Sequence, residues 1–581
     1  MAAVRASARP RLEGGLRFRR TAMTTSISTT NTSTTNPTTS ATAPTTFITT
    51  AIPFVNAEPH LGFAYELVLA DILARHRRRR GDAVRFLTGT DDNSLKNVVA
   101  AAKAGLPTAD LVARNSAAFR ALAPLLDLAS DDFIATSIDP RHRPAVELLW
   151  RTCAARGDLY QRAYTGRYCA GCEAFVDDDV EICEEHHTEP ETVRETNWFF
   201  RLSRYRDQVR ALIESNTVRV VSDSARAETL AFLAGDVRDI SVSRPASRAN
   251  GWGIPVPGDP SQVIYVWFDA LTNYLSALDL AGDRALFARY WDGEPRDELH
   301  IGARTHVIGK GISRFHAVYW LAFLLSANLP LPTTIAVHGY LTVDQKKIAK
   351  SNNPAAVPPV VDRWGADALR WFFARRCRTR VDCDVPRESI GDAYDRDLAD
   401  RLGNLVQRTI ALVEKLAGSP APSQSRASGE PDAALGVPVP RETIDTRALR
   451  AIAEALPARV DAALAAFLPD DAASAIVELL DAANRYLESV APWKLAKTDR
   501  DAALAALYPP LEAARFAAGE LAPFVPGVSR VIAARLGDVS LAPVWGTLAP
   551  GGALRGGPPP LPRRSADGNP TRCEPRRTGL G

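Results

Sequence analysis

The most constraining feature of this 581-residue sequence is an alternation of strand-like and helix-like stretches. The β-branched run at 47–52 is typical of a buried strand, a helix is expected over 60–80, and a second strand over 84–88. Further buried strands are predicted at 263–267 and 334–338. Strands that alternate with helices build doubly wound, Rossmann-type α/β sheets. We therefore predict such a sheet, assembled from two halves that are separated in the sequence.

A change of composition divides the rest of the chain. Ala/Leu/Arg-rich amphipathic stretches begin near residue 396 and predict an all-α bundle. The expected helices are 396–416, 445–467, 470–490 and 500–535. Residues 24–46 are almost all Thr, Ser, Asn, Ala and Pro, and bury too little apolar surface to fold. The predicted segments are a disordered tail (1–46), the first half of the Rossmann-type domain (47–154), a connective insertion (155–235), the second half (236–340), a segment that begins with a lysine-rich loop (341–395), the helical bundle (396–545) and a second disordered tail (546–581).

Composition excludes several classes of protein. With 46% hydrophobic and 24% charged residues, the chain is not globally disordered, and a net charge of +3 excludes a uniformly basic nucleic-acid binder. No apolar run reaches the roughly 18–20 residues that a membrane span needs, so no membrane association is expected. The N-terminal segment is rich in Arg, Ser and Thr and poor in acids, as transit peptides are. A start at Met23 is the simpler interpretation, so we expect a cytoplasmic protein, with an organelle matrix as the minor alternative.

Three of the seven cysteines fall within fifteen positions and predict a metal site. Cys169 and Cys172 form one short-spaced pair, and Cys183 and His186 form a second. Three thiolates and one imidazole close a tetrahedron around Zn²⁺ and leave no open position, which is typical of a structural site. His187 competes for the fourth place. The other cysteines are scattered, as expected in a reducing compartment: Cys153, Cys377, Cys383 and Cys573.

Two polar segments on either side of the insertion indicate a nucleotide site. His60 and Gly62 lie where a strand gives way to a helix, and there the backbone N–H groups and the helix dipole favour a phosphate. The stretch Lys-Lys-Ile-Ala-Lys-Ser at 346–351 places ammonium groups in a polar loop, where they neutralise the charge of a leaving phosphate. Either segment alone is a weak signal. Their order, with a split α/β domain between them, makes the signal specific.

These residues together resemble a known family. His-Leu-Gly-Phe at 60–63 is similar to the HIGH signature of class I aminoacyl-tRNA synthetases, and Lys-Ile-Ala-Lys-Ser at 347–351 is similar to their KMSKS loop. The resemblance is greatest to the methionyl-tRNA synthetases and extends from about 47 to about 542. Further similar stretches are 86–91, 265–270, the cysteine cluster, 484–487 and 491–493. The resemblance implies an ATP-dependent ligase that activates methionine and transfers it to methionine tRNA.

The resemblance also implies which residues form the sites. Catalytic roles fall to His60, Gly62, Lys347 and Lys350, and ATP contacts to His60, Gly62, Lys310, Lys350 and Ser351. The implied methionine pocket is Ile52, Phe54, Asp91, Trp267, Ala270, Tyr274, Ile312 and His316, with Asp91 binding the ammonium group. The implied anticodon contacts are Asn404, Arg408 and Trp493, whose side chains suit unstacked bases. The implied cofactors are Mg²⁺, which shares the charge of the pyrophosphate, and structural Zn²⁺, and a monomer is expected.

Several positions depart from the family pattern, which leaves two alternatives open. Phe63 replaces the second histidine of HIGH, and Gly311 stands where the family has an aspartate that binds the ATP ribose. The other departures are Phe54 for a tyrosine, Asn93-Ser94 for a His-Gly pair, and Ile348-Ala349 for Met-Ser. Lost hydrogen bonds of about 1–3 kcal/mol each would slow adenylation. The alternatives are a weakened or non-catalytic tRNA-binding or regulatory paralogue, and a synthetase-like enzyme that activates another amino acid.

Overall fold

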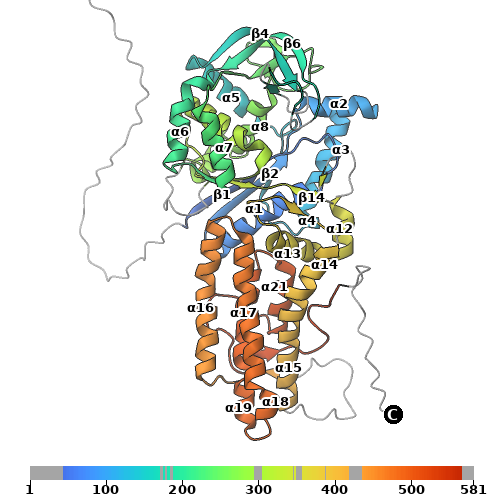
Figure 1. Cartoon of the computed structure of the whole chain (residues 1–581), viewed down its shortest axis with the longest axis vertical. Helices are drawn as coiled ribbons and strands as arrows, with labels where there is room; N and C mark the ends of the chain where they lie inside the picture. The colour runs from blue at the N-terminus through green and yellow to red at the C-terminus, as the bar shows by residue number, and fades with distance from the viewer. Residues whose placement is uncertain are drawn as a thin grey trace, which may run out of the picture. The chain divides into compact units, whose positions relative to one another are not determined.

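The computed structural model of the chain separates Met1–Thr42 from a second unit, Ala43–Gly581, and all that follows concerns the second unit (Figure 1). The structure describes residues 43–169, 174–176, 179–183, 187–292, 304–343, 346–348, 356–386, 388–417 and 435–564. No helix within these ranges is both long and apolar enough to cross a bilayer.

A six-stranded parallel sheet forms the centre of the α/β domain, with the order β3-β2-β1-β12-β13-β7. Its strands are β1 (Thr45–Thr50), β2 (Ala83–Thr90), β3 (Asp132–Ala135), β7 (Arg219–Val221), β12 (Arg304–Gly309) and β13 (Thr334–His338). The order reverses between β1 and β12, which pair in register from Phe47↔Arg304 to Thr50↔Val307. In open α/β sheets, ligands bind at such a switch point, beyond the carboxyl ends of the strands. The predicted doubly wound sheet is confirmed, and so is its assembly from two halves that are separated in the sequence.

Helix α1 (Leu61–Arg79) follows β1 and is buried along nearly its whole length. It packs on β1, β2 and β12 and also against α13 (Ala366–Arg376) of the region that follows the sheet. The other helices of the α/β part are α2 (Leu95–Ala104), α3 (Thr108–Arg120), α4 (Leu122–Leu125), α5 (His142–Ala155), α6 (Arg206–Glu214), α7 (Asp223–Ala234), α8 (Val266–Leu271), α9 (Asn273–Ser276), α10 (Ala285–Tyr290) and α11 (Leu321–Ala327). Short 3₁₀ segments, η1 (Leu202–Tyr205) and η2 (Lys310–Ile312), and the π-helix η3 (Phe315–Trp320) complete it.

The strand predicted at 263–267 is wrong as a strand of the central sheet. Val263 and Ile264 end β11 (Asp259–Ile264), which pairs antiparallel with β9 (Ser243–Pro245) and β10 (Pro255–Val256), and Val266 already begins α8. A short apolar run does not distinguish a strand from a buried helix, which explains the error. The central strand in this half is β12, which the sequence analysis missed because it contains Arg304 and His306. Both side chains are buried.

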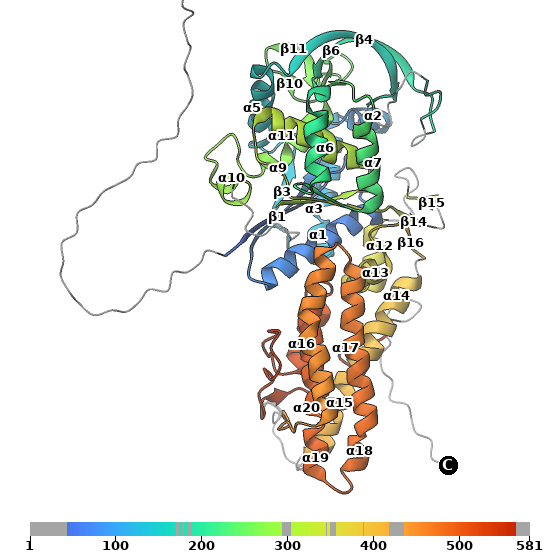
Figure 2. The ribbon, with the colours of Figure 1, turned by 60° about the vertical axis from the view of Figure 1, so that its left-hand side comes forward.

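The insertion carries a four-stranded antiparallel sheet of order β5-β4-β6-β8 (Figure 2). Its strands are β4 (Leu159–Cys169), β5 (Ala174–Val176), β6 (Glu191–Phe200) and β8 (Ile240–Ser241). Strand β7 also lies inside the range 155–235 that was predicted for the insertion. It nevertheless pairs with β13 as an edge strand of the central sheet, so part of this range belongs to the Rossmann-type domain.

A small three-stranded sheet links the α/β part to the helices that follow. It contains β14 (Leu341–Val343), β15 (Lys346–Lys347) and β16 (Cys383–Asp384), in the order β15-β14-β16. In the sequence, α12 (Val357–Trp364) and α13 lie between β15 and β16, and α14 (Glu388–Tyr394) follows β16. The first two residues of the lysine-rich stretch, which was predicted to be a polar loop, therefore form a strand, β15, of this sheet.

The predicted helical bundle is present, with one predicted helix divided (Figure 2). Its elements are the π-helix η4 (Asp395–Gly403), α15 (Asn404–Ala417), α16 (Ile444–Ala465), α17 (Pro469–Val490), α18 (Pro492–Leu495), α19 (Arg500–Ala505), α20 (Tyr508–Leu521) and α21 (Pro526–Arg535). The stretch 500–535, expected as one helix, forms three, because α20 and α21 each start with proline in the first turn, where its missing N–H is tolerated.

Residues 546–564 correct the predicted C-terminal tail. Strand β18 (Ala553–Leu554) pairs with β17 (Leu435–Gly436), and the side chains of Leu548, Leu554 and Leu561 are buried in the bundle core. The Arg563 guanidinium also bonds both carboxylate oxygens of Asp400. The Gly/Pro/Arg composition predicted disorder here, but a few leucines suffice to anchor the segment.

Candidate active site

The HIGH-like segment places His60 at the N-cap of α1. Its Nδ1 accepts a hydrogen bond from the Gly62 N–H at 3.1 Å, and His60 also forms an antiparallel bridge with Ala356. A Cβ at position 62 would lie 3.0 Å from the His60 ring, so glycine permits this close approach. Because Nδ1 accepts, the proton of a neutral ring lies on Nε2, which is the tautomer that donates to a phosphate oxygen. The histidine and the helix N-terminus together suit an anion.

The methionine pocket implied by the sequence assembles from distant segments. The indole of Trp267, in the first turn of α8, stacks on Phe315 with ring centroids 3.7 Å apart and an interplanar angle of 7°. The Phe54 ring meets the same indole edge-on at 6.3 Å, and the His316 ring lies 6.4 Å from it. Phe315 was not predicted from the sequence. Aromatic faces and edges of this kind pack well against a polarisable thioether.

The remaining predicted pocket residues belong to the same region. Ile52, Trp267 and Ile312 pack half-buried against one hydrophobic cluster, and Tyr274 is a buried member of that cluster. Ala270 is buried on α8, one helical turn after Trp267. The structure therefore brings the predicted apolar residues of the pocket together.

His316 is a buried histidine that is held in one tautomer by its hydrogen bonds. The Nδ1 of His316 lies 3.0 Å from the carbonyl oxygen of Ile312, which only accepts, so Nδ1 carries the proton. The Tyr274 hydroxyl therefore donates to Nε2 of His316 at 2.7 Å. Burial lowers the pKa of His316 to about 4 and raises the pKa of Tyr274, so both groups are neutral at physiological pH.

His306 extends this network and was not predicted. The Trp320 indole N–H donates to Nε2 of His306 at 3.2 Å, so Nδ1 donates to the Thr49 hydroxyl at 2.8 Å. Its ring stacks on Tyr274 with centroids 4.1 Å apart. Burial, and then the nearby His316, lower the pKa of His306 well below its usual value. The buried groups around Tyr274 are thus polar but uncharged.

Asp91 follows the last residue of β2, at the carboxyl edge of the sheet. Its N–H donates to the Pro53 carbonyl oxygen at 2.9 Å, and it bridges to Phe54 in parallel fashion, so β2 and the segment after β1 run together here. The residue is 2% exposed. A carboxylate at this position beside Phe54 fits the role of an ammonium ligand.

A second buried carboxylate, Asp269, ties this edge to α8. The Asn93 amide donates to Oδ2 of Asp269 at 2.8 Å, and His142 Nε2 bonds to Oδ1. The other ring nitrogen of His142 bonds to the Ser276 hydroxyl at 2.9 Å. Asp269, His142 and Ser276 are fully buried. This network, which the sequence analysis missed, fixes the helix that carries Trp267 against the end of β2.

The positions that depart from the family pattern have structural roles. Phe63 is 8% exposed and packs edge-on against Phe119 at 5.1 Å, so it belongs to the core. Ser94 is the N-cap of α2, and its hydroxyl accepts from the Lys96 N–H. Lys96 Nζ in turn lies 4.7 Å from the centre of the Phe54 ring. Gly311 is exposed in η2.

The lysine side of the predicted nucleotide site is described in part. Lys310 Nζ lies 2.8 and 2.9 Å from the two carboxylate oxygens of Asp382, and 4.8 Å from the centre of the Tyr340 ring. The backbone of Lys347 lies in β15 and pairs with Thr342 of β14. The side chain of Lys347, and all of Lys350 and Ser351, lie outside the described residues.

The predicted anticodon residues lie on the helical bundle and face solvent. Asn404 and Arg408 are exposed one turn apart on α15. The Arg408 guanidinium lies 3.9 Å from the Glu488 carboxylate near the end of α17, and Trp493, 39% exposed, follows in α18. An amide, a guanidinium and an indole are therefore accessible to unstacked bases.

Two of the four predicted zinc ligands are described. Cys169 is the last residue of β4, and the Cys183 N–H donates to the Thr188 carbonyl oxygen. Both cysteines are buried. Cys172 and His186 lie outside the described residues. Within the described part of the chain, no group of three or more His, Cys, Asp or Glu side chains is placed to hold a metal ion.

The fold and the site define the class of protein. A parallel sheet with a histidine-capped helix at its switch point, followed by a helical bundle, is the arrangement of a class I aminoacyl-tRNA synthetase. The family "tRNA synthetases class I (M)" matches residues 46–189 and 181–410, and the "Anticodon binding domain of methionyl tRNA ligase" matches 439–549. The chain belongs to the methionyl-tRNA synthetase family.

Individual relatives agree with this assignment. The methionine–tRNA ligase of Brucella melitensis is 38% identical over 487 residues, which cover 82% of this chain and 89% of the relative. That of Mycobacterium tuberculosis is 38% identical over 531 residues, covering 88% and 96%. A solved structure of the Mycobacterium tuberculosis methionyl-tRNA synthetase with methionyl-adenylate is similar with a TM-score of 0.81 at 36% identity, over 90% of this chain and 100% of that one.

Proposed function

We propose that this chain activates methionine with ATP and transfers the methionyl group to methionine tRNA. The observation that carries the proposal is the aromatic pocket of Trp267, Phe315 and Phe54 at the switch point, beside the buried Asp91. Similarity to methionine–tRNA ligases over 82% and 88% of this chain supports it. The solved relative with bound methionyl-adenylate supports methionine and ATP as substrates.

The residues divide the work between binding and charge stabilisation. Asp91 binds the methionine ammonium group, and the aromatic rings enclose the thioether. The methionine carboxylate attacks the α-phosphorus of ATP, the bond to the β-phosphate oxygen breaks, and pyrophosphate leaves. His60 Nε2 donates to the α-phosphate, while Lys310, Lys347 and Lys350 hold the charge that develops on pyrophosphate. Mg²⁺, when bound with ATP, shares that charge.

The transfer step and the structural metal complete the proposal. A ribose hydroxyl of the tRNA attacks the adenylate carbonyl and AMP leaves, while Asn404, Arg408 and Trp493 bind the anticodon. Zn²⁺ is held by Cys169, Cys172, Cys183 and His186. The burial of Cys169, at the end of β4, and of Cys183, after β5, supports this ligand set. A monomer in the cytoplasm stays a prediction, which light scattering and cell fractionation test.

Amino-acid-dependent pyrophosphate exchange tests the proposed function. Exchange with methionine alone is expected. Asp91→Ala should abolish the exchange and leave tRNA affinity almost unchanged, because the anticodon residues lie on another domain. Asp110→Ala, an exposed carboxylate on α3, is the matched control and should retain full activity. No exchange with any amino acid, with tRNA binding retained, would favour the non-catalytic alternative. Exchange with a different amino acid would refute methionine as the substrate.

A further inference from the structure

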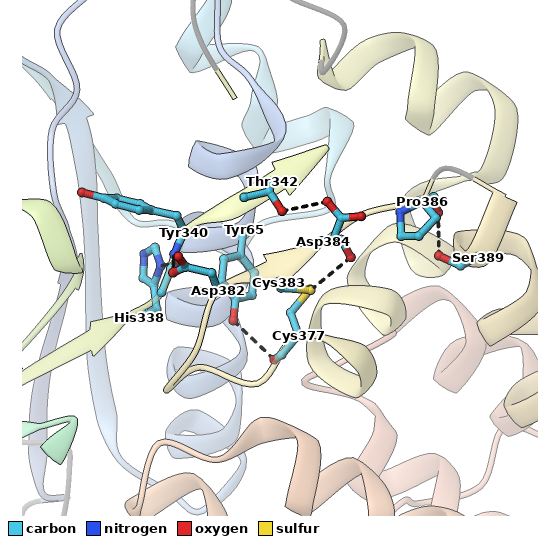
Figure 3. The surroundings of a disulfide bond; sticks show 11 residues. Tyr65, His338, Tyr340, Thr342, Cys377, Asp382, Cys383, Asp384, Pro386 and Ser389 are labelled. Atoms are coloured by element: carbon cyan, nitrogen blue, oxygen red, sulfur yellow. Dashed lines mark hydrogen bonds between the residues drawn. A yellow bond between two sulfur atoms is a disulfide. The ribbon is translucent and has the colours of Figure 1, made fainter. Parts of the chain in front are cut away.

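Two cysteines that are scattered in the sequence analysis lie together in the structure. Cys377 is the C-cap residue directly after α13 and Cys383 begins β16, and they form a disulfide with their Cα atoms 5.2 Å apart (Figure 3). This Cα separation is within the usual range for disulfide-bonded cysteines. Both residues are buried, and Cys383, at 9% exposure, is the more accessible. Disulfides of intracellular proteins are usually transient and often sense redox state.

The loop 378–382, which this disulfide closes, contacts the nucleotide side of the α/β domain. The Gly339 N–H donates to the Thr379 carbonyl oxygen at 2.8 Å, and the Tyr340 N–H donates to Oδ1 of Asp382 at 2.8 Å. A Cβ at position 339 would lie 2.3 Å from the Val381 carbonyl oxygen, so the two segments are in close contact. Figure 3 shows Asp382 beside Tyr340 and His338, at the end of β13.

The loop also determines the surroundings of Lys310. Both carboxylate oxygens of Asp382 lie within 2.9 Å of Lys310 Nζ, and Asp382 immediately precedes Cys383. Strand β16, which Cys383 begins, pairs with β14, and β14 pairs with the lysine-bearing β15. A covalent bond at Cys383 therefore restrains the carboxylate that pairs with Lys310, at the edge of the lysine-rich segment.

The Asp382 carboxylate and an ATP phosphate compete for the Lys310 ammonium group. To bind an ATP phosphate, Lys310 must leave Asp382, and a loop closed by a disulfide has less freedom to move that carboxylate away. The side chains of Lys310 and Asp382 are 45% and 43% exposed, so their attraction is screened by water. Exposed ion pairs of this kind change an equilibrium by about two- to fivefold.

We propose that Cys377 and Cys383 form a reversible redox site whose disulfide weakens ATP binding by holding Asp382 against Lys310. The proposal rests on the assignment of Lys310 to ATP in the proposed function. Peroxide is the oxidant: the Cys383 thiolate attacks one peroxide oxygen, the O–O bond breaks, and hydroxide leaves as the sulfenic acid forms. The Cys377 thiol then attacks the sulfenic sulfur, and its proton leaves with the hydroxyl group as water while the S–S bond forms. A dithiol reverses the reaction by exchange and is itself oxidised to its disulfide. In a reducing compartment the dithiol form is then the ground state.

The first measurement is the redox state itself. The native full-length protein is treated with hydrogen peroxide or with dithiothreitol, alkylated after denaturation, and mapped by peptide mass spectrometry. Peroxide should give the Cys377–Cys383 peptide pair, and dithiothreitol should return two alkylated cysteines. Failure of peroxide to form this pair in the native protein would overturn the proposal.

The second measurement is ATP affinity by calorimetry in the two states, which needs no catalytic activity. The oxidised protein should bind ATP about two- to fivefold more weakly than the reduced protein. Cys377→Ser/Cys383→Ser should remove the redox dependence. Cys153→Ser, a buried cysteine elsewhere in the Rossmann-type domain, should retain it. Asp382→Asn keeps both cysteines and should make the two states equal at the tighter affinity.

The outcomes separate this site from the proposed function. Equal ATP affinity in the oxidised and reduced protein, with the disulfide demonstrated, refutes the coupling through Asp382. Persistence of the redox effect in Cys377→Ser/Cys383→Ser also refutes it, because a different cysteine would then be responsible. Redox-dependent ATP binding without any pyrophosphate exchange supports the redox site and counts against the proposed enzyme activity alone.

Discussion

The hydrogen bond between Tyr274 and His316 supports a sharp prediction for the methionine pocket. Because Nδ1 of His316 donates to the Ile312 carbonyl oxygen, Nε2 has no proton and depends on the Tyr274 hydroxyl, 2.7 Å away. Tyr274→Phe removes that hydroxyl and keeps the ring that stacks on His306. His316 is 1% exposed, so water does not simply replace the lost donor.

The expected magnitude follows from this geometry. A buried acceptor left without a donor costs about 1–3 kcal/mol, so the free energy of unfolding of Tyr274→Phe should fall by that amount in urea titrations. His316 also borders the Trp267 ring, and its displacement should weaken methionine binding. The same energy corresponds to a roughly five- to hundredfold higher KM for methionine in pyrophosphate exchange. The KM for ATP should change little, since neither side chain is on the nucleotide side.

Tyr160→Phe is the matched control for this prediction. The Tyr160 hydroxyl donates to the Asp239 carboxylate at 2.9 Å, but the residue is only half-buried on β4 of the insertion. Its loss should cost less than about 1 kcal/mol and leave both Michaelis constants unchanged. An equal loss of stability in the two variants, or an unchanged KM for methionine in Tyr274→Phe, would show that the assigned tautomer and its role are wrong.

Three further predictions concern acid stability, a buried ion pair and ATP affinity. The pKa of His316 is about 4 in the folded protein and about 6.5 in the unfolded chain, so the unfolded chain binds more protons. The free energy of unfolding should therefore fall by up to about 3 kcal/mol as the pH drops from about 6.5 to about 4. A urea unfolding midpoint that does not change over this pH range would contradict the prediction. Arg370→Met removes the guanidinium that pairs with buried Asp71 at 2.7 Å and should lower the unfolding free energy by about 3 kcal/mol, measured by chemical denaturation; a loss below about 1 kcal/mol would contradict it. Gly311→Asp should lower the KM for ATP if this position faces the ribose, and an unchanged KM would count against that role.

Local sequence patterns predicted the elements whose signal is strong and continuous. The β-branched run before His60 is β1, and the helix predicted after it is α1. The strands predicted at 84–88 and 334–338 are β2 and β13. The pattern failed where tertiary contacts override it. Strand β12 was missed because Arg304 and His306 make its sequence look polar. Both side chains can be buried because the folded protein supplies partners, such as Trp320 and Thr49 for His306.

The site was predictable in its residue types but not in its connections. The family resemblance identified Trp267 and His316, but Phe315 and His142 carry no motif. Asp269 lies in the similar stretch 265–270, but its role depends on contacts with His142 and Asn93, each more than a hundred residues away. The pairing of Cys377 and Cys383 was missed for a different reason. A separation of six residues is compatible with many geometries, and only the end of α13 and the start of β16 bring the two sulfurs together.

The departures from the family signature do not affect all ligands equally. Asn93 donates to the buried Asp269 carboxylate, as a histidine at that place would, so a donor is retained where one is needed. Phe63 joins the core against Phe119, and the Phe54 ring packs edge-on against Trp267, so both substituted side chains are accommodated by aromatic contacts. Gly311, in contrast, is exposed and has no side chain to offer a nucleotide. The loss therefore falls on ATP rather than on methionine, and we expect a raised KM for ATP with amino-acid recognition intact.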